Sequence, residues 1–338
     1  MSIPNHHTRR RLLGMAAVVA AAAALTGCAG EDAEATAETL NIDFATYNPL
    51  SLIIKEKGWL EATLEDEGVE VNWLQSAGSN KANEGLRSEA LHVGSTAGSA
   101  ALLARANGAP IKTIALYSQP EWSAIVTPEG SDIESVEDLK GKKVAATKGT
   151  DPYFFLVQAL QAHGLTVDDV TIENLQHADG WGALNNGSVD AWAGLDPIMA
   201  GAEEEGAQLV YRNLDFNTYG FLNATEEFLE NEPELAQAVV DAYQKAQEWA
   251  AENPEETAQI LAEEAGLEQP IADKVILERS NLDVDPVPGE AQREVLEAVG
   301  PIFVEIGDVS EQASIDEAVD TLFEPSFAED ADASTLKE

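Results

Sequence analysis

Three short segments of this sequence combine glycine with small hydroxyl and amide side chains, which are groups suited to binding a small anion. The segments are Gly78-Ser79-Asn80, residues 94–99 and residues 147–152. Each follows an apolar run that predicts a strand and precedes a segment with helical spacing. A helix N-terminus presents unpaired backbone N–H groups and the positive end of the helix dipole, so an anion is favoured there. Ordinary N-capping explains any one of these turns, but three of them together predict a crevice at the carboxyl ends of the strands.

The elements that must position these turns follow a βαβ order. From residue 40 to about residue 211, short apolar runs alternate with amphipathic stretches, which predicts a mostly parallel sheet covered by helices. The expected strands are 40–45, 69–74, 91–94, 111–118, 123–127, 143–146, 170–175, 191–195 and 208–211. The expected helices are 50–58, 80–88, 97–107, 152–163 and 197–205.

The last third of the chain has a different pattern. From residue 225 onward the apolar residues recur at helical spacing, which predicts a helical segment. Gly300-Pro301 interrupts this spacing and predicts a kink or a break in a helix. The tail over residues 329–338 is polar and is expected to fray.

The composition limits both the partners and the architecture. The chain has 338 residues, with 19 Lys and Arg against 61 Asp and Glu and a formal net charge of -42. So few cations among so many acids exclude a nucleic-acid binder, which needs a basic face. We interpret the acid excess as a solvated surface typical of salt-loving organisms. The length and the 44% apolar content predict two lobes, and the single cysteine excludes an intramolecular disulfide.

The N-terminus has the pattern of an export signal. Arg9 and Arg10 precede an apolar run over residues 12–25, which is too short to cross a bilayer as a helix. The adjacent arginines resemble a twin-arginine signal, and Leu25-Thr26-Gly27-Cys28 resembles a lipobox, in which Cys28 is lipidated. We therefore expect a signal peptide over 1–27 and an acidic tether over 28–38. The lipid on Cys28 would attach the protein to the outer face of the cytoplasmic membrane.

The sequence lacks the motifs of common enzymes and metal sites. It contains no G-x-S-x-G, no G-x-x-x-x-G-K-[ST], no H-E-x-x-H and no G-x-G-x-x-G in a strand-to-helix turn. His92, His163 and His177 have no second histidine or cysteine at ligand spacing, so neither a metal nor a cofactor is expected. We interpret His177 and the nearby Asp179 as an ordinary surface pair rather than as a catalytic base and its partner.

Three longer stretches carry a resemblance to a known family. They are residues 78–106 (GSNKANEGLRSEALHVGSTAGSAALLARA), 139–160 (LKGKKVAATKGTDPYFFLVQAL) and 179–197 (DGWGALNNGSVDAWAGLDP). Together with residues 219–229 (YGFLNATEEFL) and the helical last third, they resemble the substrate-binding proteins of ABC transporters for aliphatic sulfonates, nitrate and taurine. The resemblance covers nearly the whole chain that follows the expected tether.

The resemblance implies an α/β, two-lobed periplasmic-binding-protein fold of type II, with two hinge crossings, mixed sheets flanked by helices and a helical C-terminal third. Lobe one would comprise residues 39–122 and 222–328, and lobe two residues 123–221. The crossings would lie near 122–127 and 216–222. A small molecule would bind between the lobes of a monomer and hold them closed, which an ABC permease can read.

The resemblance also implies ligand-binding positions in this sequence. In lobe one they are Tyr47, Asn48, Ser79, Asn80, Ser95 and Thr96. In lobe two they are Thr147, Gly149, Thr150 and Asp151. Trp122 and Tyr153 are expected either to wall the apolar part of the ligand or to pack under the hinge and the helix. Glu121 does not suit an anion site, and if it points inward it would pair with an amine of the ligand. Asp196 is a cleft residue or, in the favoured interpretation, a helix cap, and Tyr219 completes the set.

One departure from the family leaves the ligand open. Leu195 and Ile198 flank Asp196-Pro197, where sulfonate-binding relatives usually have aromatic residues. Our first expectation is a small organic anion, an aliphatic sulfonate; the alternatives are taurine, nitrate or a pyrimidine precursor of thiamine. An enzyme on the same fold is disfavoured because the sole cysteine, Cys28, lies at the expected lipid anchor.

Overall fold

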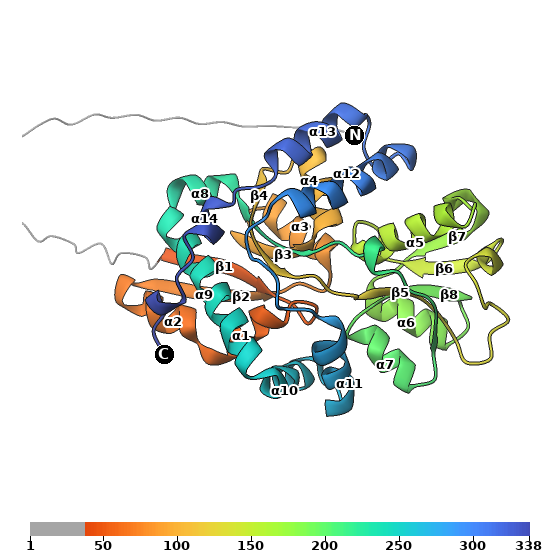
Figure 1. Ribbon diagram of the computed structural model, residues 1–338, viewed down its shortest axis with the longest axis horizontal. Coiled ribbons are helices and arrows are strands. Elements are labelled where there is room, and N and C mark those ends of the chain that lie inside the picture. Colours follow the sequence, from red (N-terminus) through yellow and green to blue (C-terminus); the bar gives the residue numbers. More distant parts are fainter. Residues whose placement is uncertain (1–37) are drawn as a thin grey trace, which may run out of the picture. The chain divides into compact units, whose positions relative to one another are not determined.

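The computed structural model of the protein describes residues 38–338, so the expected signal peptide, Cys28 and the tether up to residue 37 lie outside the described residues. Two five-stranded sheets organise the described chain (Figure 1). We call the halves built on them the first and the second lobe. The first sheet has the order β2-β1-β3-β10-β4, with β1 Glu38–Phe44, β2 Val69–Gln75, β3 Val93–Ala97, β4 Ile111–Ser118 and β10 Gly220–Thr225. The second has the order β7-β6-β8-β5-β9, with β5 Ser123–Thr127, β6 Lys143–Ala146, β7 Thr171–Asn174, β8 Ala191–Leu195 and β9 Gln208–Tyr211.

Both sheets are mixed, as the resemblance implies, rather than mostly parallel, as the βαβ alternation predicts. In the first sheet β1 runs parallel to β2 and β3, whereas β10 runs antiparallel to β3 and β4. In the second sheet β6 runs parallel to β7 and β8, whereas β5 runs antiparallel to β8 and β9. The antiparallel strands β5 and β10 are the first strands that follow the two crossings between the lobes, 119–122 and 212–219.

The sequence analysis did not predict strand β10. All six residues of GFLNAT are buried, so the strand has no alternation of buried and exposed side chains. Its central polar residue, Asn223, donates to Thr96 Oγ1 at 2.8 Å and accepts from Thr113 Oγ1 at 2.7 Å. A polar residue that is satisfied in this way inside a sheet breaks the apolar run by which a buried strand is recognised.

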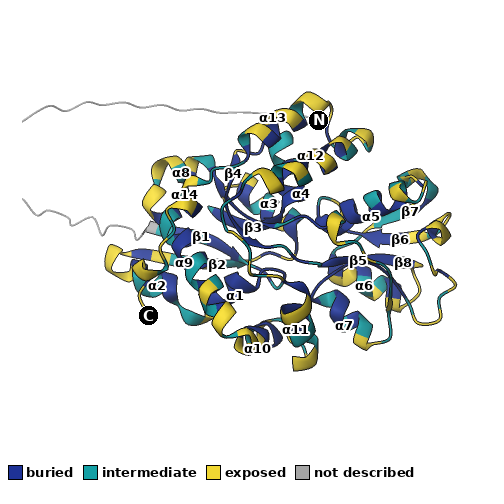
Figure 2. Ribbon diagram, viewed as in Figure 1, coloured by how far each residue is buried: buried dark blue, intermediate teal, exposed yellow. Residues whose placement is uncertain are grey.

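Helices cover both lobes, with exposed residues on their outer faces and buried residues toward the sheets (Figure 2). The first lobe contains α1 Pro49–Lys57, α2 Trp59–Leu64, α3 Ser79–Arg87, α4 Gly98–Ala106, α8 Glu226–Asn231, α9 Pro233–Glu252, α10 Pro254–Ala265, α11 Gln269–Lys274, a π-helical turn Val275–Arg279, α12 Glu290–Glu305, α13 Gln312–Thr321 and α14 Ser326–Glu329. The second lobe contains α5 Asp151–Ala162, α6 His177–Asn185 and α7 Ile198–Glu204. Among the described residues no helix combines the length and the apolar character that crossing a membrane requires.

Helix α5 is apolar on most of its surface because it is covered on most sides. Nine of its twelve residues are buried, and it packs on β5 and β8 of its own lobe and on α4 and α12 of the first lobe. Phe154 of α5 and Phe303 of α12 are both fully buried, with ring centroids 4.4 Å apart. One apolar core therefore continues from the second lobe into the first.

Helix α12 passes through Gly300-Pro301 without a break, although a break was one of the two outcomes that the sequence predicted. Pro301 lies on the exposed side of the helix. A Cβ atom at position 300 would lie 2.4 Å from Ile315 Cγ2 of α13, so glycine is required there by the close approach of the two helices.

The tail is packed rather than frayed. Leu336 is only 6% exposed, and Thr335 Oγ1 donates to Asp241 Oδ2 of α9 at 2.7 Å. The backbone N–H of Asp332 donates to the other oxygen of the same carboxylate at 2.9 Å. A buried carboxylate on α9 thus holds a segment that its polar composition alone predicts to be loose.

Candidate functional site

The three glycine-rich turns lie together in the region where the lobes meet, which we call the seam. Ser79 Oγ of the first turn accepts a hydrogen bond from the backbone N–H of Ala97 in the second turn, at 3.0 Å. Ser99 Oγ of the second turn donates to Asp151 Oδ1 of the third turn, at 2.5 Å. Because the third turn belongs to the second lobe, the latter bond crosses the seam.

The second segment is not a turn over most of its length, because residues 94–97 belong to β3 and α4 begins at Gly98. We keep the name second turn for it; its polar groups are occupied by bonds within the protein. The N–H groups of Gly98 and Ser99 donate to Tyr219 O at 2.9 Å and to Thr218 Oγ1 at 3.0 Å. The N–H and the hydroxyl of Ser95 both donate to the buried carboxylate of Asp43, at 2.9 and 3.1 Å. Thr96 accepts from a buried asparagine of β10 and donates to Ala97 O. Ser95 and Thr96 therefore hold the first sheet together instead of facing a ligand.

The first and third turns, in contrast, keep free donors. No hydrogen bond among the described residues uses the N–H groups of Ser79 and Asn80, which open α3, or those of Gly149 and Asp151, which open α5. Gly149 has a φ of 78°, which favours glycine, and a Cβ atom there would lie 3.8 Å from Asn80 Cβ. Two helix N-termini from different lobes thus approach each other, which is an arrangement suited to one anion.

A histidine that the sequence analysis placed on the surface lies in this part of the seam. His177 is 2% exposed, and burial lowers its pKa to about 4. Its Nδ1 is 3.2 Å from Thr147 Oγ1, and its Nε2 has no hydrogen-bond partner among the described residues. A signal for it was available, since residue 177 follows β7 and opens α6 just as the three turns follow their strands.

Asp151 joins both lobes and both crossings. Its carboxylate accepts from Ser99 Oγ at 2.5 Å, from Thr218 Oγ1 and the Thr218 N–H, both at 2.7 Å, and from Trp122 Nε1 at 2.8 Å. Burial raises the pKa of Asp151, although these hydrogen bonds oppose that shift. These four donors occupy the carboxylate, so of the two polar groups of Asp151 that face the seam only the backbone N–H remains free of partners in the described part of the chain.

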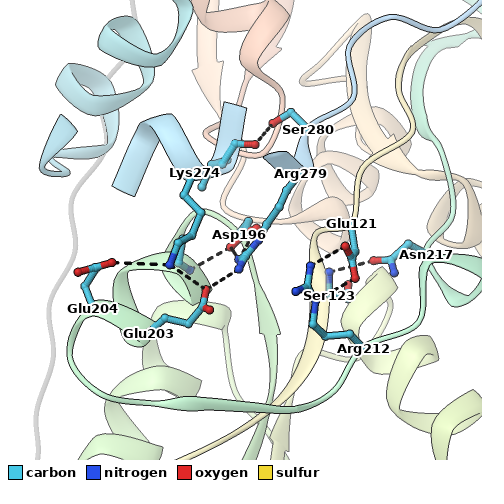
Figure 3. A network of polar contacts seen from close by, with 12 residues as sticks. Glu121, Ser123, Asp196, Glu203, Glu204, Arg212, Asn217, Lys274, Arg279 and Ser280 are labelled. Carbon is cyan, nitrogen blue, oxygen red and sulfur yellow. Dashed lines mark hydrogen bonds and ion pairs between the residues drawn. The ribbon is translucent and has the colours of Figure 1, made fainter. Parts of the chain in front are cut away.

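A second polar group in the seam is ionic (Figure 3). Arg279, 5% exposed, lies 3.2 Å from Asp196 Oδ2 and 2.6 Å from Glu203 Oε2 of α7. Lys274 of α11 adds longer contacts to Glu203 and Glu204, at 3.8 and 3.6 Å. Burial raises the pKa of Asp196 to about 6, although Arg279 lowers it. The sequence analysis missed Arg279 because it lies in a helical segment without any motif.

Asp196 acts at the start of α7 and lies beside a small cavity. Its Oδ1 accepts from the Ala200 N–H in the first turn of α7 at 2.9 Å, which is a cap. It also lines a small cavity of about 10 Å³ together with Tyr47, Trp122 and Arg279, which is room for about one water. The rings of Tyr47 and Trp122 meet edge to face, with centroids 6.2 Å apart.

The other expected site residues are bound within the protein. Asn48 caps α1 and donates to Tyr243 Oη at 2.8 Å, and Thr150 Oγ1 donates to Thr147 O at 2.6 Å. Tyr153 packs on Phe154, and burial raises its pKa to about 12. Tyr219 contributes its carbonyl to the second turn, and its ring is partly buried against the shared apolar core.

Glu121 does not face the seam's donors. It forms a two-pronged ion pair with Arg212, at 3.0 and 2.6 Å (Figure 3), and both side chains are partly exposed. Because Glu121 is already paired with Arg212, there is no reason to expect it to pair with an amine of the ligand. The described residues also contain no group of three or more His, Cys, Asp or Glu side chains placed to hold a metal ion.

Two mixed sheets flanked by helices, two crossings and a donor-lined seam define the class of the periplasmic binding proteins. A family model described as NMT1/THI5 like matches residues 50–257. A protein of Bacillus subtilis (strain 168), whose name describes it as an aliphatic sulfonates-binding protein, is 32% identical over 270 residues, which are 78% of this chain and 81% of the relative. The chain belongs to the NMT1/THI5-like family.

Solved structures give the same fold. The alkanesulfonate-binding protein SsuA of Xanthomonas axonopodis pv. citri, bound to MOPS, aligns with a TM-score of 0.75 at 22% identity and covers 83% of this chain and 97% of its own. The periplasmic aliphatic sulphonate binding protein SsuA of Escherichia coli aligns with a TM-score of 0.70 at 25% identity, over 85% of this chain and 92% of its own. The Bacillus and Xanthomonas proteins are binding proteins, and the chain is classed with them rather than with enzymes, although the desulfurization enzyme DSZB shares the fold with a TM-score of 0.64 at 16% identity.

Proposed function

We propose that the chain is an extracytoplasmic solute-binding protein that captures an aliphatic sulfonate between its lobes and delivers it to the permease of an ABC importer. The observation that carries the proposal is the approach of α3 and α5, whose free N–H groups come from different lobes. A sulfonate has three oxygens that accept hydrogen bonds, so one group can be held by both helices. Such a ligand stabilises the closed arrangement by binding it better than an open one.

The comparisons support the ligand class. The Bacillus relative is named for aliphatic sulfonates, and the Xanthomonas structure holds MOPS, which carries a sulfonate on an alkyl chain. The buried aromatic pair Tyr47 and Trp122 lies next to the first turn of α5, through the bond from Trp122 to Asp151. We assign the alkyl chain to this side of the seam.

The remaining parts of the proposal come from the sequence. Cys28 would be lipidated after removal of residues 1–27 and would anchor the protein outside the cytoplasmic membrane, with residues 28–38 as the tether. Residues 39–122 and 222–328 would move as one lobe of a monomer and residues 123–221 as the other. The importer would read the relative position of these lobes.

The test is calorimetric titration of the purified protein with ethanesulfonate, nitrate and a thiamine-precursor pyrimidine. We expect binding of ethanesulfonate and at least about tenfold weaker binding by Asn80→Asp, because a like charge is placed beside the anion while an acid at a helix N-terminus leaves the fold intact. Ala313→Asp is the matched control, since it adds an exposed acid to the first turn of α13, outside the seam. Binding of the pyrimidine alone, or equal affinity in Asn80→Asp, would refute the proposal.

A further inference from the structure

The hydrogen-bonding state of His177 follows from its neighbour. Thr147 Oγ1 lies 2.6 Å from Leu175 O, and a carbonyl oxygen only accepts, so the single hydroxyl proton of Thr147 points to Leu175. The contact between Thr147 Oγ1 and His177 Nδ1 at 3.2 Å then requires a proton on Nδ1. Because the imidazole is neutral, Nε2 carries a lone pair and accepts hydrogen bonds.

This lone pair faces the N-terminus of α3. A Cβ atom at Gly78, which precedes the helix, would lie 3.0 Å from His177 Nε2 and 2.9 Å from Asn80 Oδ1. Asn80 Oδ1 is a second buried acceptor without a partner among the described residues. Two acceptors therefore stand beside the free N–H groups of Ser79 and Asn80, which are donors.

An anion alone does not match this set of groups. Its oxygens accept from the backbone N–H groups, but they repel the lone pair on Nε2, and a buried acceptor left unpaired is costly. The matching ligand has anionic oxygens and, a few bonds away, a hydroxyl or an ammonium group. The first satisfies the helix N-termini and the second satisfies His177.

We propose that the ligand of this seam is a sulfonate that carries a hydrogen-bond donor on its carbon chain near the anionic group, and that His177 Nε2 accepts that hydrogen bond. The inference rests on the proposed function, which it narrows from aliphatic sulfonates in general to hydroxyalkyl and aminoalkyl sulfonates. A hydroxyl and an ammonium group share the required chemistry and differ in charge, so both are compared in the test.

The test compares ethanesulfonate, 2-hydroxyethanesulfonate and 2-aminoethanesulfonate, which differ only in the group at carbon 2, by calorimetric titration of the purified protein. Two variants distinguish the roles of the two ring nitrogens of His177. His177→Asn retains an N–H at the position of Nδ1 for Thr147 and removes the acceptor, whereas His177→Gln retains a polar group at the position of Nε2. Thermal unfolding of each variant checks that it is folded.

We expect the wild-type protein to bind at least one donor-bearing sulfonate about tenfold or more tightly than ethanesulfonate, as is typical when a buried acceptor gains a partner. The preference should disappear in His177→Asn, which should bind ethanesulfonate at least as tightly as the wild type because no acceptor is left unpaired, and it should persist in part in His177→Gln. The better of the two donor-bearing ligands identifies the hydroxyl or the ammonium as the natural group.

Three results would overturn the inference. Equal affinity for all three ligands in the wild-type protein would remove the donor requirement and leave the proposed function standing. A preference unchanged in folded His177→Asn would show that Nε2 is satisfied inside the protein, as by a reversed Asn80 amide. Binding of none of the three sulfonates would refute the proposed function itself.

Discussion

Two of the contacts between the lobes have opposite chemistry. Near α12 the contact is apolar: Phe154 of α5 meets Phe303, and both are fully buried. Near α11 the contact is ionic: Arg279 meets Asp196 and Glu203. The apolar contact gains free energy from burial alone, which neither salt nor pH changes much. In the ionic contact, attraction opposes the cost of removing charges from water, so its net contribution is small and depends on conditions.

The largest effect is expected from the apolar contact. Phe303→Ala should lower the free energy of unfolding by about 3–5 kcal/mol, because it removes a fully buried ring and leaves a cavity. Urea unfolding measures this, and the loss should be the same in dilute buffer and in 1 M NaCl. Phe303→Leu is the matched control and should lose under about 1.5 kcal/mol. Similar losses for both variants would show that the ring is not closely packed.

The pH dependence of the ionic contact should be next in size. The pKa of Asp196 is raised to about 6 by burial, so the folded state retains a proton that the unfolded state releases near its ordinary value of 3.8. Stability from this group is therefore present at low pH and is lost as the pH rises from about 4 to about 6, by up to about 3 kcal/mol. The urea midpoints of the wild type and of Asp196→Asn are measured from pH 4 to 8. The difference between the two midpoints at each pH isolates the contribution of Asp196. A difference independent of pH would contradict the prediction.

The smallest effect is expected when the cation is removed. Arg279→Met should cost about 2 kcal/mol at pH 7, less than a fully buried pair, because Glu203 is partly exposed and Asp196 can take up a proton. The double variant Arg279→Met, Asp196→Asn should recover part of this loss.

In molar salt the wild type should gain stability, since its net charge of -42 is screened. The difference in free energy of unfolding between the wild type and Arg279→Met should narrow in molar salt. A difference that widens would refute the ionic account.

Much of the fold could be predicted from the sequence because its strands have clear patterns. Residues 111–118, 123–127, 143–146, 191–195 and 208–211 are strands with the predicted bounds. Strand β10 was not predicted, because burial on both faces removes the alternation of apolar and polar residues and Asn223 interrupts its apolar run. A break at Pro301 does not occur, because a local propensity was overruled by packing of α12 on α13.

The site was predictable only in outline. The chain topology brings the three predicted segments to one seam, but the second of them is occupied by bonds within the protein. Which hydroxyls face a ligand depends on tertiary neighbours: Ser95 is occupied by Asp43, and Ser79 by Ala97. Arg279 and His177 are buried beside partners that are distant in sequence, Asp196 for the arginine and Thr147 for the histidine. No local sequence pattern contains these contacts.

The carboxylate of Asp151 connects the second lobe to both crossings. It accepts hydrogen bonds from Trp122 and Thr218, one on each crossing, so the first turn of α5 is attached to both of them. Gly149, whose N–H is free of partners among the described residues, is only two residues from this carboxylate. A ligand bound at Gly149 would therefore be attached to a segment of the second lobe that is hydrogen-bonded to both crossings.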